Sequence, residues 1–227
     1  MTTFLITGAN RGIGLALTDA IIARGDRVIA TVRDPFKVPE LLRTAPRDQM
    51  VLLGMDVRDG RAVSRAGATL REPVDVLINN AGIFGPERQA ALDMDFEGFA
   101  DTLAVNTLAP LRVAQAFIPQ LKQSKAPRIL TISSQMGALS GSASGSAAYR
   151  TSKAAVNKLM QCLASELRAD GITVAVAHPG WVQTDMGGAG ADITAAESAA
   201  GLIALADKLT LADTGHFFRW DGAAHPW

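Results

Sequence analysis

The sequence predicts an α/β fold in which helices cover both faces of a doubly wound parallel sheet of six or seven strands. Short runs of β-branched and aliphatic residues alternate with segments whose apolar residues recur at helical spacing. The short runs are apolar throughout, which indicates strands that are buried on both faces. No linker, low-complexity block or internal repeat interrupts the alternation, so we expect one domain over residues 1–227.

The elements follow one another in a regular order along the chain. The strand-like runs lie at residues 4–7, 27–32, 50–55, 74–79, 128–133 and 172–177. Helical patterns lie between them, at residues 14–24, 58–71, 93–122 and 148–169. Ligands of such folds bind beyond the carboxyl ends of the strands, so the residues that follow each strand are the first candidates for a functional site.

Composition narrows the class of partner. Lys plus Arg and Asp plus Glu number 22 each, so no basic field predicts a nucleic-acid partner. No apolar run approaches the ~20 residues that span a bilayer, and no basic leader precedes the first strand, so we expect a cytoplasmic protein without membrane contact. The single cysteine, Cys162, cannot form an internal disulfide, which fits a reducing compartment. His178, His216 and His225 lack metal-ligand spacing, so we expect no metal site.

A glycine-rich loop follows the first strand, in the stretch T-G-A-N-R-G-I-G. Gly8, Gly12 and Gly14 have the spacing G-x-x-x-G-x-G. Such a turn between strand and helix lets the backbone approach a pyrophosphate, while the helix N-terminus supplies amide donors. A purely structural turn is the alternative. The position directly after the first strand favours a dinucleotide site.

The end of the second strand reads A-T-V-R-D-P, and dinucleotide enzymes select their cofactor at this position. Arg33 is placed to bind a ribose 2′-phosphate, and Arg11 in the glycine loop offers a second cation. The sequence therefore favours NADP(H) over NAD(H). Asp34 is the counterargument, because it could bind a ribose hydroxyl instead, and Arg33 could also be a solvated loop residue.

The only tyrosine, Tyr149, lies four residues before Lys153 in Y-R-T-S-K. Residues at i and i+4 share one face of a helix, so the lysine ammonium can act on the phenol. A free tyrosine titrates near ~10, and a neighbouring cation lowers that pKa whereas burial raises it. The pair is either a chance arrangement on a solvated face or an acid catalyst with its charge partner.

Several motifs, taken in order, resemble those of one family. They are T-G-A-N-R-G-I-G, Asp56-Val57, N-N-A-G at 79–82, Asn106 in A-V-N-T, Ser134 in T-I-S-S, Tyr149 to Lys153, and P-G-W-V-Q-T at 179–184. Over almost its whole length the chain resembles the short-chain dehydrogenases/reductases, whose domain is a Rossmann fold. Its segment 178–194 and its ending F-F-R-W-D-G-A-A-H-P-W resemble more narrowly the C-factor and sniffer-type carbonyl reductase branch.

The resemblance implies a catalytic set of Asn106, Ser134, Tyr149 and Lys153. Tyr149 is then the general acid in carbonyl reduction and the general base in alcohol oxidation. Lys153 lowers the pKa of Tyr149 and binds the nicotinamide ribose, and Ser134 donates a hydrogen bond to the developing alkoxide. Asn106 holds a water that passes protons to Lys153. An asparagine that caps or kinks its helix is the alternative for Asn106.

The resemblance also implies which residues bind the cofactor. Asp56 holds the adenine amino group, Thr184 contacts the nicotinamide carboxamide, and three residues of N-N-A-G line the cofactor and steady the central strand, namely Asn79, Ala81 and Gly82. The full cofactor-binding set is Gly8, Asn10, Arg11, Gly12, Ile13, Gly14, Arg33, Asp56, Val57, Asn79, Ala81, Gly82, Tyr149, Lys153, Pro179, Gly180, Val182 and Thr184.

One departure from the family pattern lies between Ser134 and Tyr149. The chain is about two residues longer there, in G-S-A-S-G-S at 141–146, where a loop insertion costs little. Side chains alternate at a strand end, so we assign the family serine to Ser134 and regard Ser133 as its structural neighbour.

These residues predict an oxidoreductase that transfers a hydride between NADP(H) and a small carbonyl or alcohol substrate, with Tyr149 as acid or base. Segment 185–200 predicts a short, mobile lid over an open site, and hence broad acceptance of aldehydes and ketones, including aromatic or quinone-like ones. Candidates for apolar walls of that site, with core packing as the alternative, are Phe84, Met136, Trp181 and Met186.

Two other functions stay open. A dinucleotide-binding regulator would bind NADP(H) with little turnover. Signalling associations in the C-factor branch favour it, although a sensor has no need of the proton donor Tyr149. A sugar-nucleotide epimerase or dehydratase would need a larger C-terminal region than we expect after Thr184. By resemblance, helices 93–122 and 148–169 form the interface of a homodimer or homotetramer.

Overall fold

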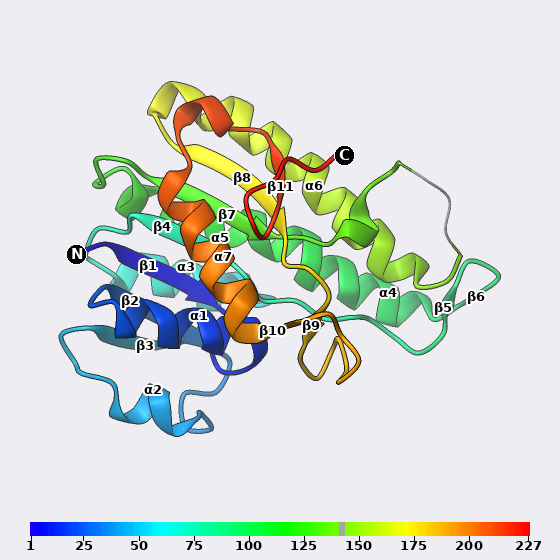
Figure 1. Ribbon diagram of the computed structural model, residues 1–227, viewed down its shortest axis with the longest axis horizontal. Helices are drawn as coiled ribbons and strands as arrows, with labels where there is room; N and C mark the ends of the chain where they lie inside the picture. The colour runs from blue at the N-terminus through cyan, green and yellow to red at the C-terminus, as the bar shows by residue number, and fades with distance from the viewer. Residues whose placement is uncertain (141–143) are drawn as a thin grey trace.

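The computed structural model of the protein describes residues 1–140 and 144–227. Seven strands of these residues form one sheet in the order β11-β8-β7-β4-β1-β2-β3, and all neighbouring strands are parallel (Figure 1). The strands are β1 (Thr3–Thr7), β2 (Arg27–Val32), β3 (Met50–Gly54), β4 (Val76–Asn79), β7 (Arg128–Ile132), β8 (Thr173–His178) and β11 (Phe217–Arg219). The order reverses between β1 and β4, so the predicted doubly wound sheet is confirmed.

The edge strand β11 is the member of this sheet that the sequence did not predict. Its three residues are too few to show a periodic pattern. It pairs with β8, placing Phe217 opposite Val176, and Phe217 is 2% exposed. The strand therefore forms through contacts with the core rather than through local preference.

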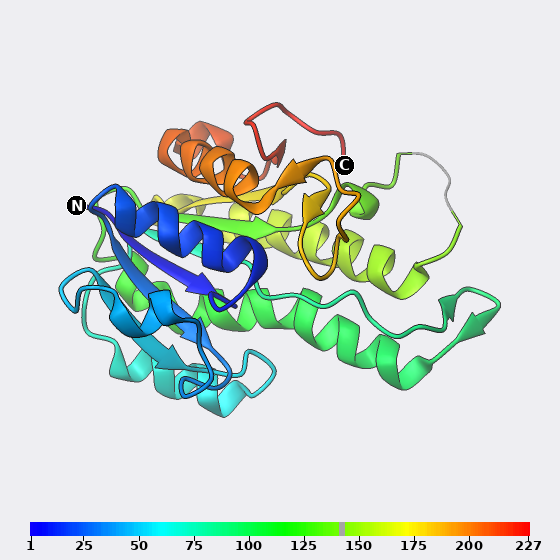
Figure 2. The same cartoon turned by 60° about the horizontal axis from the view of Figure 1, so that its bottom comes forward.

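Helices cover both faces of the sheet, as Figure 2 shows. On one face lie α1 (Gly12–Ala23) and α7 (Ala195–Lys208), and on the other lie α3 (Gly60–Thr69), α5 (Ala109–Leu121) and α6 (Ala147–Leu167). The remaining elements are α2 (Glu40–Thr44), α4 (Phe96–Leu103), β5 (Gln89–Ala90), β6 (Asp93–Met94), β9 (Val182–Gln183), β10 (Ile193–Thr194) and 3₁₀ turns at Gln135–Gly137, Arg168–Asp170 and Leu211–Asp213.

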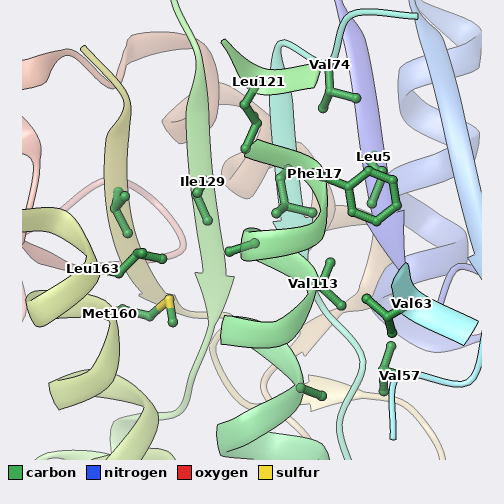
Figure 3. Packing of buried hydrophobic residues seen from close by; sticks show 14 of the residues in the cluster. Leu5, Val57, Val63, Val74, Val113, Phe117, Leu121, Ile129, Met160 and Leu163 are labelled. Atoms are coloured by element: carbon green, nitrogen blue, oxygen red, sulfur yellow. The ribbon is translucent and has the colours of Figure 1, made fainter. Parts of the chain in front are cut away.

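The sheet is buried on both faces because successive side chains of a strand point in opposite directions. In β1, Leu5 joins the core beneath α3, α5 and α6, whereas Phe4 and Ile6 join the core beneath α1 and α7. Figure 3 shows the first of these cores, in which Phe117 of α5 and Ile129 of β7 are fully buried. This two-sided burial explains why the strands are apolar throughout.

The predicted helix 93–122 is interrupted in the structure. A π-helical turn, Ala104–Leu108, separates α4 from α5, and residues 93–94 belong to strand β6. Asn106 lies in the middle of this turn. Single π turns often occur at functional sites, where they redirect a side chain, and a hydrophobic pattern does not reveal them.

The predicted lid 185–200 is shorter than expected, because α7 begins at Ala195. A capping box explains where the helix begins. The Thr194 hydroxyl accepts the N–H of Glu197 (3.2 Å), and the Glu197 carboxylate accepts the N–H of Thr194 (2.8 Å). The loop that can cover a site therefore ends at β10.

Candidate active site

A cavity of about 290 Å³ opens at the carboxyl ends of the parallel strands, where such folds bind ligands. Its walls come from the loops after β1, β2, β3, β4 and β8 and from the first turns of α6. The predicted cofactor residues that line it are Gly8, Asn10, Arg11, Gly12, Ile13, Arg33, Asp56, Val57, Ala81, Gly82, Tyr149, Lys153, Pro179 and Thr184. Candidates from many parts of the sequence thus meet in one place.

The glycine loop after β1 packs tightly against the N-N-A-G segment. Gly8 has a φ of +68°, a left-handed conformation that favours glycine. A Cβ on Gly14 would lie 2.2 Å from the Gly8 carbonyl oxygen and 2.6 Å from Nδ2 of Asn80, so only glycine fits there. The Asn80 amide donates to the carbonyl oxygens of Thr7 (2.9 Å) and Gly8 (3.2 Å). These contacts bring the backbone N–H groups at the start of α1 to the cavity wall, as an anion site requires.

The two asparagines of N-N-A-G have different positions. Asn80 borders the cavity, whereas Asn79 is 3% exposed. The Asn79 amide donates to the Pro110 carbonyl oxygen (3.2 Å) and to Thr131 Oγ1 (3.3 Å). Asn79 therefore ties β4 to α5 and β7, in line with the strand-steadying role, but it lies outside the cavity. The sequence analysis missed Asn80, because two adjacent asparagines carry no signal of which one faces a ligand.

Three other predicted cofactor residues also lie outside the cavity wall and shape the backbone instead. Gly14 is in contact with the loop after β1, as described above. Gly180 has a φ of +87°, and a Cβ there would lie 2.7 Å from Cδ1 of Ile193. Val182 is 4% exposed within β9. Gly180 and Val182 lie in the segment between Pro179 and Thr184, both of which line the cavity.

The end of β2 presents Arg33 to the cavity. Asp34 does not line it. Its carboxylate accepts the backbone N–H two residues later (3.0 Å) and lies 3.8 Å from the Lys37 ammonium. The carboxylate that argued for NAD(H) is thus engaged in its own turn. Arg11 also borders the cavity, where it forms an exposed ion pair with Asp185 (3.2 Å).

Arg58 is a cavity residue that the sequence analysis missed. Its guanidinium donates to Asp56 (2.9 Å) and lies 3.3 Å from Asp101, which links the loop after β3 to α4. The hydrogen bonds from Arg58 lower the pKa of Asp56, and Arg33 adds a smaller effect in the same direction. The signal in the sequence was a basic residue directly after Asp56-Val57, which has no assigned role in the family motif.

Tyr149 and Lys153 lie on the first two turns of α6, and both line the cavity. The Lys153 ammonium lies 5.8 Å from the centre of the Tyr149 ring and donates to the carbonyl oxygen of Ile132 (2.9 Å). Both residues are buried, with 8% of Tyr149 and 5% of Lys153 exposed. The chance pair on a solvated face is therefore the wrong interpretation.

Burial acts in opposite directions on the two groups. It lowers the pKa of Lys153 to about 8, because the ammonium loses its hydration. It raises the pKa of Tyr149, because the phenolate would lose its hydration, and the Ser134 hydroxyl opposes this shift through a hydrogen bond. In the protein by itself the pKa of Tyr149 is thus raised, chiefly by burial, and the lowering of this pKa by Lys153 and the nicotinamide charge stays a prediction.

The two serines after β7 differ in what their hydroxyls contact. Ser133 borders the cavity, but its hydroxyl is 2.6 Å from Oδ1 of Asn157 and the residue is 2% exposed. Ser134 is not among the residues that line the cavity, and it accepts the N–H of Met136 (3.1 Å). A hydrogen bond from its side chain nevertheless lowers the pKa of Tyr149. This bond, together with the engagement of the Ser133 hydroxyl by Asn157, favours Ser134 over Ser133 as the partner of the tyrosine.

Asn106 is 1% exposed and fixes the π-helical turn to the loop after β4. Its Oδ1 accepts the N–H of Ile83 (2.9 Å), and its Nδ2 donates to the Ile83 carbonyl oxygen (2.8 Å) and to the Ser152 hydroxyl (3.0 Å). Both amide hydrogens are thus engaged with the protein. These bonds agree with the alternative of a residue that kinks its helix, and the water-holding role of Asn106 stays a prediction.

Three of the four proposed apolar wall residues are substantially exposed. Phe84, Trp181 and Met186 are 42%, 55% and 46% exposed, so core packing is the wrong interpretation for them. The Phe84 ring lies 4.9 Å from the Tyr149 ring, and Met186 borders the cavity. The Trp181 indole donates to a carbonyl oxygen in the lid loop (2.8 Å), which leaves its face open. Met136 is only partly exposed.

A family model described as short chain dehydrogenase matches residues 2–192. The chain belongs to the short-chain dehydrogenase family. This short-chain dehydrogenase is 43% identical to C-signal of Myxococcus xanthus over 157 residues, which cover 68% of this chain and 93% of that protein. It is 32% identical to the carbonyl reductase Sniffer of D. melanogaster, with a TM-score of 0.92 over all of both chains. It is 33% identical to the NADPH-bound carbonyl reductase from chicken fatty liver, with a TM-score of 0.90 over 100% of this chain and 99% of that one.

These relatives confirm the resemblance that the motifs indicated, including its narrower branch. Within residues 1–140 and 144–227 of this short-chain dehydrogenase, no helix is long and apolar enough to cross a membrane. The same residues contain no group of three or more side chains suited to hold a metal ion. Residues 141–143, in the predicted loop insertion, lie outside the described residues.

Proposed function

We propose that this short-chain dehydrogenase reduces aldehydes or ketones with NADPH, and catalyses the reverse oxidation of alcohols, with Tyr149 as the acid or base. The observation that carries the proposal is that Tyr149 and Lys153 line the same cavity as Arg33, with the Ser134 hydroxyl hydrogen-bonded to Tyr149. Carbonyl reductases among the structural neighbours are described as bound to NADPH or NADP, which supports the same cofactor here.

The residues present fit such a cofactor. The close packing of the glycine loop places Gly12 and Ile13 at the cavity wall, where the start of α1 could bind a pyrophosphate. Arg33 faces the cavity at the end of β2 and would hold a 2′-phosphate, while Asp34 is engaged in its turn. Asp56, kept ionised by Arg58, would accept a hydrogen bond from an adenine amino group. Thr184 also lines the cavity and would contact the carboxamide.

In the proposed reduction, the protein supplies the proton and the geometry. When bound, NADPH supplies the hydride for the carbonyl carbon. Burial keeps the Tyr149 phenol protonated at neutral pH, so it can donate its proton to the substrate oxygen. Lys153, still largely protonated at that pH, stabilises the phenolate that donation leaves behind. Ser134 donates a hydrogen bond to the same substrate oxygen and so stabilises its developing charge.

The test is the loss of NADPH and NADH absorbance with a panel of aliphatic, aromatic and quinone-like carbonyl compounds. Wild type should use NADPH in preference to NADH, and Tyr149→Phe should lose the activity while binding NADPH normally. Undiminished turnover in Tyr149→Phe would refute the assigned acid. Equal or better use of NADH would refute the role given to Arg33.

The identity to a protein named C-signal favours a second candidate, a regulator that binds NADP(H) with little turnover. The same assay separates the two. Tight NADPH binding without turnover of any compound in the panel would support the regulator. The buried proton donor argues for the enzyme, because a pure sensor has no need of Tyr149.

We further propose that residues 1–227 form one domain and that the protein acts in the cytoplasm. We also propose that it forms a homodimer or homotetramer through the helices α4, α5 and α6. Phe96 of α4 is 77% exposed and Leu108 of the π-helical turn is 51% exposed, which leaves apolar surface on this part of the molecule. Light scattering of wild type and Leu108→Asp tests the assembly. A monomeric wild type would refute it.

A further inference from the structure

The first turn of α6 is fixed in an unusual way. Tyr149 is the third residue of this helix, so its N–H has no acceptor within the helix. A helix normally satisfies such a group with a side chain at the preceding cap position. Here that position is Ser146, which has a φ of +50° and provides no side-chain cap. The acceptor is instead Oε1 of Gln89, at 3.1 Å, from a residue 60 positions away.

Gln89 comes from the β5–β6 hairpin, which lies beside the start of α6 (Figure 1). Its side chain is buried, with 5% of the residue exposed. While Oε1 accepts from Tyr149, Nε2 donates to the carbonyl oxygen of Phe84 (3.2 Å). The Phe84 ring in turn lies 4.9 Å from the Tyr149 ring. One glutamine therefore fixes the backbone of Tyr149 directly and positions the aromatic group that packs against its ring.

We propose that Gln89 is a positioning residue for the proton donor, and that it sets where the Tyr149 hydroxyl lies relative to the cavity. The inference rests on the proposed function of Tyr149. Removing the amide leaves a buried N–H without a partner, which the helix can relieve only by fraying or shifting its first turn. Such a shift moves the reacting hydroxyl, and a displacement near 1 Å can lower a rate about a hundred-fold. Lys153 and the glycine loop are held by other contacts, so cofactor binding is spared.

A purely structural role for a buried glutamine is the competing explanation, and the chain offers a matched control. Gln120 is also 5% exposed, and its Nε2 donates to the carbonyl oxygens of Gly67 and Leu70 at 2.8 Å each. It joins α5 to α3, away from the cavity lining. A methionine has nearly the same shape but no hydrogen-bonding amide, so the same substitution can be compared at both sites.

The experiment compares Gln89→Met, Gln89→Glu, Gln120→Met and Tyr149→Phe with wild type in kcat, KM, NADPH affinity and amide exchange. Gln89→Met should lower kcat at least about ten-fold, leave the Kd for NADPH within about two-fold, and speed exchange in residues 147–153. Gln120→Met should lower Tm but leave kcat and that exchange near wild type. Gln89→Glu keeps an acceptor for the Tyr149 N–H. It should therefore retain more of the wild-type kcat, and more of the protection of residues 147–153 from exchange, than Gln89→Met.

The inference would be overturned if Gln89→Met had the same kcat as Gln120→Met. It would also be overturned if Gln89→Met lost as much NADPH affinity as kcat, or if its amide exchange in residues 147–153 became faster without any loss of kcat. If Gln89→Met does not fold, Gln89→Glu becomes the deciding variant. Faster amide exchange in residues 147–153 of Gln89→Glu, together with a wild-type kcat, would rule out a positioning role for Gln89. Full activity in Tyr149→Phe would overturn the proposed function itself. An inactive Tyr149→Phe beside a fully active Gln89→Met would overturn only the role of Gln89.

Discussion

Replacing Lys153 by methionine should stabilise the fold relative to wild type near neutral pH while abolishing the proposed activity. The ammonium of Lys153 is almost completely buried, and burial lowers its pKa from 10.5 to about 8. In the unfolded chain the lysine returns to water and to its ordinary pKa. The folded state therefore carries a free-energy cost as long as Lys153 stays charged.

The sign and size of the effect follow from proton linkage. Below the folded pKa of about 8, Lys153 is charged in both states, and at about 1.4 kcal/mol per pH unit the cost is about 3 kcal/mol. Between about 8 and 10.5 the unfolded chain binds more protons than the folded protein, so the stability of wild type rises with pH. By about pH 9.5 the cost has fallen by about 2 kcal/mol. Methionine carries no charge and so adds no pH-dependent cost, although it leaves the Ile132 carbonyl oxygen without its hydrogen-bond donor at every pH.

The observable is the change with pH in the stability difference between variant and wild type. Urea unfolding of wild type, Lys153→Met and the control Lys158→Met at about pH 7 and about pH 9.5 measures it. The advantage of Lys153→Met should shrink by about 2 kcal/mol at the higher pH, because the buried charge is then lost from wild type. Lys158 is exposed on the same helix, and its substitution should show no such trend. A difference that stays constant, or grows with pH, would refute the argument that Lys153 is a buried, destabilising cation.

Three further predictions concern the cavity. Arg33→Ala should weaken NADPH binding about ten-fold and leave NADH binding unchanged, because it removes a charge-assisted contact with one phosphate; fluorescence titration with both cofactors measures this. Arg58→Ala should weaken both cofactors alike in the same titration, since Arg58 holds Asp56, and Asp101→Asn should do so less. Ser134→Ala should lower kcat about a hundred-fold at unchanged NADPH affinity, whereas a wild-type kcat would show that its hydroxyl does not reach the substrate oxygen.

The sequence predicted those features that repeat or that carry a family motif. Apolar runs identified six strands of the main sheet, because a strand that is buried on both faces is apolar at nearly every position. It did not predict the π-helical turn around Asn106, which depends on bonds to Ile83 in a distant loop. Nor did it predict Gln89 or Arg58 as parts of the site. Each is a single polar residue whose partner lies far away in the sequence, so no local pattern reveals it.

The same burial that lowers the pKa of Lys153 raises that of Tyr149, and this reverses the order in which the two groups lose their protons. In water the tyrosine would ionise first or together with the lysine. In this cavity the lysine becomes neutral near about 8, while the phenol keeps its proton at higher pH. A protonated phenol is the form that donates to a carbonyl oxygen, and a phenolate is the form that accepts from an alcohol. The protein by itself therefore holds Tyr149 in the protonated form that reduction needs, and alcohol oxidation depends on a further positive charge beside Tyr149. On this argument reduction is lost as the pH rises and oxidation is lost as the pH falls, so a pH profile in which oxidation persists at low pH while reduction is lost there would contradict it.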